Sequence, residues 1–100
     1  STVVARFEPC RKDTGRGTVY YRIYKGHNRR MEFSRAYDWP VSSWDETMKT
    51  VKGDNAEACR LRAQIEADLE LLNQIITEDT ESRLTMGDMI NLFKRRRTII

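Results

Sequence analysis

The side chains best suited to bind a ligand alternate with apolar residues in the segment 18–25. Tyr20, Arg22 and Tyr24 occupy the even positions, and the odd positions carry Val19, Tyr21 and Ile23. A period of two places the two sets on opposite faces of a β-strand. Arginine makes bidentate contacts with guanine edges and phosphates, and a tyrosine hydroxyl donates to phosphate. The pattern therefore predicts a strand face suited to nucleic acid.

Neighbouring segments add basic residues to the same predicted surface. Arg6 lies in an apolar run at 2–9, Arg30 and Glu32 lie at 29–35, and a Gly-containing loop covers 10–17. The predicted DNA-binding residues are Arg6, Arg11, Lys12, Arg16, Tyr20, Arg22, Tyr24 and Arg30. The alternative is that these are ordinary solvated strand residues, because aromatic and basic neighbours also stabilise a sheet across its strands.

Other chemistry has little support in the residue types. The single His27 cannot build a histidine metal site or a triad, and Cys10 and Cys59 fit no metal-ligand spacing. No carboxylate pair or nucleophile–base pair accompanies the basic set. We therefore predict no catalytic residue, no metal and no cofactor, with both thiols free in a reducing cytosol. No apolar run reaches the length of a membrane span and no signal peptide is visible, so a soluble intracellular protein is expected.

The elements that must position these side chains follow from periodicity. Strands are predicted at 2–9, 18–25 and 29–35, and residues 36–53 are predicted to form a loop from which Trp44 folds back onto the core. A long helix is predicted at 54–79, opened by a capping box of Asp54 and Glu57. Its apolar stripe comprises Ala58, Leu61, Ile65, Leu69, Leu72 and Ile76, widened by Leu71 and Ile75.

A polar break at 80–84 separates a second, shorter helix. Thr85 and Asp88 repeat the capping spacing, and the helix ends in the basic run 94–97. That run also suits a helix C-terminus without any ligand. The predicted fold is α+β, with a three-stranded antiparallel sheet packed on one long helix. The sheet residues expected to meet the helix are Val3, Ala5, Phe7, Val19, Tyr21, Ile23, Met31 and Phe33.

Charge is divided unevenly along the chain. Residues 1–53 hold 11 basic and 6 acidic residues, 54–83 hold 3 and 8, and 84–100 hold 4 and 1. Thirteen of the 18 basic residues are arginine. A localised basic surface indicates polyanion binding. The acidic helix, with Glu66, Asp68, Glu70, Glu78 and Asp79, is expected to face away from the polyanion.

The ordered set of motifs resembles the N-terminal arm-type DNA-binding domain of tyrosine-recombinase integrases of bacterial mobile elements. The matching pieces are 4–7 with Arg11-Lys12, then 19–23, 33–34, 41–45, 51–53 and Leu84-Thr85. The chain departs from many relatives at Arg35-Ala36, where they have Thr-Gly, and at Leu61-Arg62, where they have Ile-Asn. These departures bear on the subfamily and its DNA site rather than on the fold.

The resemblance implies a sheet that docks into the major groove of arm-type sites during DNA integration and recombination. It implies an arm-binding domain at 1–79, a linker at 80–84 and the start of a truncated core-binding domain at 85–100. The implied partners are double-stranded DNA and other integrase protomers, with no membrane and no small-molecule substrate, in the nucleoid of a bacterial cytoplasm. The parent would be a recombinase enzyme, but none of its catalytic residues maps onto this chain.

Two other binding roles stay open, with a free-standing enzyme ranked last. A protein-interaction domain would use the long helix or the Tyr/Arg sheet face, because both residue types favour interfaces. An RNA-binding sheet would stack bases on Tyr20 and Tyr24. The chain lacks the aromatic-glycine signature of the common RNA-recognition fold, which ranks that role below the other two.

Overall fold

The computed structural model describes residues 2–12, 15–25, 29–79 and 83–99, and the side chains of residues 25–38 lie outside this description. Three strands come first, β1 (Thr2–Pro9), β2 (Arg16–Lys25) and β3 (Arg29–Pro40). The short helix η1 (Val41–Ser43) and a small hairpin of β4 (Trp44–Asp45) and β5 (Thr50–Val51) follow. The helices α1 (Ala56–Glu78) and α2 (Met86–Arg96) complete the fold.

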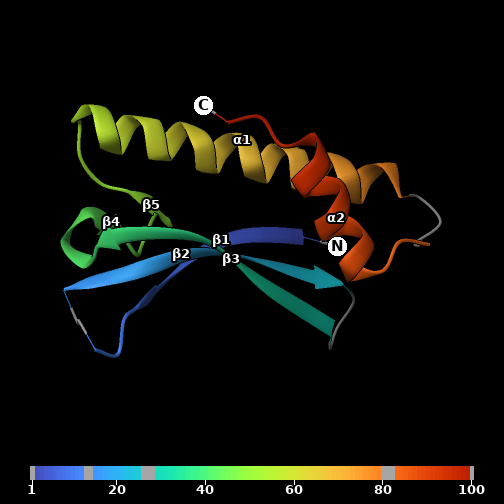
Figure 1. Ribbon diagram of the computed structural model, residues 1–100, viewed down its shortest axis with the longest axis horizontal. Helices are drawn as coiled ribbons and strands as arrows, with labels where there is room; N and C mark the ends of the chain where they lie inside the picture. The colour runs from blue at the N-terminus through green and yellow to red at the C-terminus, as the bar shows by residue number, and fades with distance from the viewer. Residues whose placement is uncertain (1, 13–14, 26–28, 80–82, 100) are drawn as a thin grey trace.

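The three long strands form an antiparallel sheet in the order β1-β2-β3. Helix α1 covers one face of this sheet, and the opposite face is left uncovered (Figure 1). The predicted α+β fold is therefore confirmed. A sheet with one covered face keeps its apolar residues on that side and its polar residues on the other.

The core lies between the sheet and the two helices. The sheet contributes Val3, Ala5, Val19, Tyr21 and Ile23, all buried as predicted, and Phe7 is partly buried against them. Met31 and Phe33 pair in register with Ile23 and Tyr21, but their side chains lie outside the described residues. Helix α1 buries Ala58, Leu61, Ile65, Leu72 and Ile75, and Leu69, Leu71 and Ile76 pack at the margin.

Trp44 closes one end of the core, as predicted. Its ring stacks on Phe7 with centroids 5.5 Å apart and an interplanar angle of 19°. Trp39 is partly buried beside the same core and donates its Nε1–H to the carbonyl of Ser43 at 2.8 Å. The Trp44 Nε1–H donates to Glu46 Oε2 at 3.0 Å, so both tryptophans bury ring surface while the indole nitrogen keeps a hydrogen bond.

Strand β3 is longer than predicted, and the expectation that residues 36–40 belong to a loop was wrong. Residues 37–40 pair with residues 16–19 of β2, which also moves Arg16 and Gly17 from the predicted loop into the strand. The register shifts between Val19 and Tyr20, which face Tyr37 and Ser34, so β3 carries a bulge at Arg35 and Ala36. Ladder hydrogen bonds along β2 outweigh the turn propensity of Asp38 and Pro40.

The two helix starts had opposite outcomes. Helix α1 is capped by Asn55, whose side chain accepts from the Ala58 backbone N–H at 2.8 Å, so the predicted Asp54–Glu57 capping box was wrong. Asparagine and aspartate cap equally well, and local sequence does not choose between adjacent ones. Helix α2 has the predicted capping box, with reciprocal bonds between Thr85 and Asp88.

Helix α2 packs into the same core. Met89 and Phe93 are buried, and the Phe93 ring meets Tyr21 edge-on with centroids 6.1 Å apart and a 75° angle. In Figure 1, α2 crosses α1, and the chain after it runs back along α1. The prediction that residues 85–100 begin a core-binding domain stays a prediction.

Candidate nucleic-acid interface

The uncovered face of the sheet carries the predicted polar cluster in register. Tyr20 of β2 pairs with Arg6 of β1, and two residues along, Arg22 pairs with Val4. Tyr24 follows on β2, opposite Arg30 of β3. The side chains of Arg6, Tyr20, Arg22 and Tyr24 are partly exposed, and Val4 is 37% exposed. The pleat therefore brings residues from separate strands onto one accessible surface, which we call the outer cluster: Val4, Arg6, Tyr20, Arg22 and Tyr24.

Arg22 lies between the two tyrosines of the outer cluster. Its Nη1 donates to Tyr24 Oη at 3.1 Å, and its Nη2 donates to Tyr20 Oη over a longer 3.5 Å. The guanidinium carbon is 6.0 Å from the Tyr20 ring centroid and 5.9 Å from that of Tyr24. These distances lie at the outer limit of cation–π attraction. The three side chains on one strand thus support one another.

The remaining predicted residues are less concentrated. Arg11 and Lys12 are exposed in the β1–β2 connection, at the end of the sheet remote from Tyr24. Arg16 is partly buried in β2, where its carbonyl accepts from the Cys10 N–H at 2.8 Å. Arg30 has a strand position beside Tyr24, and its side chain is outside the described residues. The structure therefore groups Arg6, Tyr20, Arg22 and Tyr24 and leaves Arg11 and Lys12 at the margin.

Three exposed acidic residues of α1 lie on the other layer of the molecule, whereas Glu8 is exposed on β1. Glu66, Glu70 and Glu78 are exposed on α1, which covers the opposite face of the sheet (Figure 1). Their placement agrees with the expectation that the acidic helix faces away from a polyanion. Asp79 has a different role, because its carboxylate accepts from the backbone N–H groups of Arg83 and Leu84 at 2.8 and 3.0 Å.

Asp68 belongs to the acidic residues of the helix, but it is buried and does not share their exposed surface. It is 1% exposed, and its carboxylate accepts from Tyr21 Oη at 2.7 Å, Gln64 Nε2 at 2.8 Å and Arg97 Nε at 3.0 Å. These donors come from β2, from α1 and from the chain after α2. The signal was present in the sequence, because Asp68 continues the three-and-four spacing of Leu61, Ile65 and Leu72.

The basic run after α2 belongs to the helix layer. Arg97 binds Asp68, and Arg96 Nη1 lies 3.0 Å from Glu78 Oε2. Lys94 and Arg95 are exposed at the end of α2, which lies beside α1 in Figure 1. This run therefore does not extend the outer cluster, and two of its four residues pair with carboxylates of α1.

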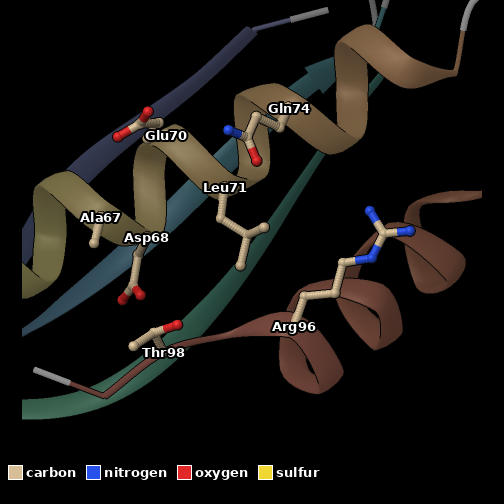
Figure 2. A pocket seen from close by; sticks show the side chains of 7 residues that line it. All are labelled: Ala67, Asp68, Glu70, Leu71, Gln74, Arg96 and Thr98. Atoms are coloured by element: carbon tan, nitrogen blue, oxygen red, sulfur yellow. The ribbon is translucent and has the colours of Figure 1, made fainter.

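A groove of about 280 Å³ lies between α1 and the segment that ends α2. It is lined by Ala67, Asp68, Glu70, Leu71, Gln74, Arg96 and Thr98. Figure 2 shows Leu71 pointing from α1 into this space, with Asp68 and Thr98 at one end and Arg96 across it. Three charged residues line it, and two of them, Asp68 and Arg96, already bind partners within the chain. The groove therefore has no convergent set of polar groups for a small molecule.

Other chemistry is sparse among the described residues. They contain no cluster of three metal-ligating side chains, and the described helices include none able to span a membrane. Cys10 and Cys59 are free and exposed. The pKa of Glu46, in the β4–β5 turn, is lowered chiefly by the hydrogen bond from Lys49, with smaller effects from the Trp44 N–H and from the charges of Lys49 and Arg6.

The comparisons with known proteins agree with the resemblance that the motifs suggested. The family model of the arm DNA-binding domain matches residues 10–85, which include β2, β3 and the whole of α1. No curated protein and no solved structure matches the chain. The match covers more than half of the 100 residues, from the first basic loop to the cap of α2. The chain therefore belongs to the arm DNA-binding domain family.

Proposed function

We propose that this chain binds double-stranded DNA through the outer cluster, with the uncovered sheet face in the major groove. The observation that carries the proposal is the alternation in β2. Tyr21 and Ile23 are buried under α1, and Tyr20, Arg22 and Tyr24 emerge on the accessible side beside Arg6. Membership of a DNA-binding domain family supplies the ligand class that this surface fits.

The dimensions of the sheet suit the groove. Neighbouring strands lie about 4.8 Å apart, so β1 and β3 are separated by roughly 10 Å. The major groove is about 12 Å wide and admits a two-stranded β-ribbon, and the separation of β1 and β3 is within that width. In this arrangement the outer strands lie near the phosphate backbones and β2 lies above the base edges. The carboxylates of α1 remain on the far side of the molecule, where they repel the DNA least.

We further propose that the chain is the arm-site module of a tyrosine-recombinase integrase acting in a bacterial cytoplasm. The support is the resemblance of the ordered motifs, and the division into 1–79, 80–84 and 85–100 belongs to the same proposal. Arm-type sites flank the crossover point, and binding to them helps assemble the recombination complex with other integrase protomers. The catalytic chemistry would belong to the parent protein, because we assign no catalytic residue here.

The first test is an NMR titration of the isotope-labelled chain with a duplex carrying the terminal repeats of the parent element. We expect amide shifts concentrated at Arg6, Tyr20, Arg22 and Tyr24, and weaker binding at about 200 mM salt than at about 50 mM, because phosphate contacts release counterions. Arg22→Ala should reduce affinity without unfolding the chain. Arg60→Ala is the matched control, because Arg60 is exposed on α1.

The outcomes separate the candidate functions. Equal losses from Arg22→Ala and Arg60→Ala would remove the outer cluster from the interface. No shifts with this duplex or a scrambled one at low salt would overturn DNA binding and favour a protein-interaction role. Tighter binding to a single-stranded RNA of the same sequence, with the largest shifts at Tyr20 and Tyr24, would instead favour base stacking on the sheet.

A further inference from the structure

We propose that Arg22 reads a guanine edge in the major groove and that Tyr20 and Tyr24 are positioning residues that hold its guanidinium in place. The inference rests on the proposed function and assigns separate roles within the outer cluster. Its basis is the contact of one guanidinium with two tyrosine hydroxyls from the same strand, at 3.1 and 3.5 Å.

The position of Arg22 favours a base over a phosphate. It lies on the middle strand, with Val4 of β1 opposite on one side and Glu32 of β3 opposite on the other. When a three-stranded sheet lies in the groove, the middle strand is the one farthest from both phosphate backbones. Arg6 is on an outer strand and is better placed for phosphate. The basic residue centred on β2 is therefore the one that faces base edges.

The two tyrosines restrict the conformation of Arg22 before DNA arrives. Residues two apart on a strand are separated by roughly 6.6 Å on the same face, so the Tyr20 and Tyr24 rings flank the arginine side chain. Both ring centroids lie about equally far from its guanidinium carbon, at 6.0 and 5.9 Å. An unrestrained arginine side chain loses much rotamer entropy when it binds, and one that its neighbours already restrain loses less.

Bidentate recognition of guanine O6 and N7 uses two N–H donors on one edge of a guanidinium. The Nε of Arg22 is buried, so the edge that could meet a base is the one formed by Nη1 and Nη2. The hydroxyls also select one orientation of the planar group, which a flexible lysine ammonium does not reproduce. Specificity for guanine therefore depends on Tyr20 and Tyr24 as well as on Arg22.

The test selects bound sequences from a randomised duplex library with the wild-type chain and with four variants, Arg22→Lys, Tyr20→Phe, Tyr24→Phe and the double phenylalanine variant. We expect the wild-type motif to contain a guanine whose preference drops roughly tenfold in Arg22→Lys. The double phenylalanine variant should lose part of that preference. Its melting temperature and the salt dependence of its binding should be unchanged, which a merely structural role for the hydroxyls would not explain. Arg95→Lys, at an exposed position of α2, is the matched control.

Three results would overturn the inference, and they differ from one another. If Arg22→Lys keeps the wild-type motif, Arg22 does not read a base. If the Arg22→Ala variant of the titration above weakens binding to every duplex equally and lowers the salt slope by about one, Arg22 contacts a phosphate. Either result leaves DNA binding by the sheet intact. If the wild-type chain enriches no sequence and binds no duplex, the proposed function fails together with this inference.

Discussion

At the scale of single residues, Asp68 is the most constrained side chain that the structure describes. A carboxylate at 1% exposure needs hydrogen bonds to offset its lost hydration, and three donors supply them. Tyr21 comes from the inner face of β2, Gln64 from α1 and Arg97 from the chain after α2. The carboxylate therefore joins the sheet to both helical parts of the fold.

Removing this carboxylate should destabilise the domain strongly. We expect Asp68→Ala to lower the free energy of unfolding by about 3–5 kcal/mol, because Arg97 and the Tyr21 hydroxyl lose their buried partner. Asp68→Asn should cost less, since the amide oxygen can still accept. Urea denaturation followed by circular dichroism measures both. A loss from Asp68→Ala no larger than that from Glu70→Ala, at an exposed site on the same helix, would contradict the role.

The sequence predicted the polar face better than it predicted this buried charge. Tyr20, Arg22 and Tyr24 follow from period two alone, because a strand with one buried face has only two registers. Asp68 pairs with residues 47 and 29 positions away, a relation that local periodicity does not contain. Its place in the apolar stripe of the helix was the only indication in the sequence that it is buried. Charged residues in such a stripe are usually assigned to the margin because they are rarely buried without partners.

At the scale of elements, Gly17 shows why β2 is paired on both sides at its start. It lies between Pro9 of β1 and Trp39 of β3. A Cβ added there would come within 2.5 Å of both the Glu8 carbonyl oxygen and Cζ of Phe7. The Phe7 ring cannot shift freely, because it stacks on Trp44. The close approach of these strands therefore requires glycine.

Gly17→Ala should destabilise the chain by about 1–3 kcal/mol, as overpacking does in other cores. Gly87→Ala serves as a control, because it should change the stability in the opposite direction. Gly87 lies in α2, where the nearest atom to an added Cβ is Thr85 Oγ1 at 3.7 Å, so alanine should stabilise the helix by about 0.5–1 kcal/mol. Thermal melts of the two variants measure the difference. If the Gly17→Ala and Gly87→Ala variants melted at the same temperature, the strands would have to move apart at Gly17 at little cost.

Helices and strands were predicted correctly where the periodicity of their side chains is strong. They were missed where pairing of the backbone with a neighbouring strand determines the structure. Strand β1 has the predicted bounds, and the predicted cap of α2 is present. The second half of β3 was assigned to a loop because Asp38 and Pro40 disfavour strands. There the ladder with β2 supplies the stabilisation, and a bulge at Arg35 and Ala36 keeps the same faces aligned. A two-residue insertion preserves the alternation, but the sequence alone does not reveal the insertion.

At the scale of the whole molecule, the exposed carboxylates of α1 lie on the layer opposite the outer cluster. The outer cluster presents arginines on the sheet face, and the helix layer presents Glu66, Glu70 and Glu78. A layer spacing of about 10 Å exceeds the Debye length of about 8 Å at physiological salt. If DNA docks on the sheet as proposed, the carboxylates of α1 would have little direct effect on it, although they lower the net charge of the whole chain to +3.

This separation predicts a small electrostatic effect from α1. Glu66→Gln with Glu70→Gln should raise DNA affinity less than about twofold at 150 mM salt, and more at low salt where screening weakens. Fluorescence anisotropy with a labelled duplex measures both conditions. A gain of tenfold or more at 150 mM would place DNA against α1 and contradict docking through the sheet.

The packing of Trp39 and Trp44 against the core has a consequence for fluorescence. Trp44 is stacked on Phe7 and Trp39 packs beside the same core, so neither belongs to the outer cluster. Their emission should report unfolding and stay nearly constant when a duplex occupies the sheet. A ligand that binds only the folded state raises the unfolding free energy by RT ln(1 + [L]/Kd). Melting curves recorded on these two indoles at increasing duplex concentration would therefore yield the dissociation constant without any attached dye.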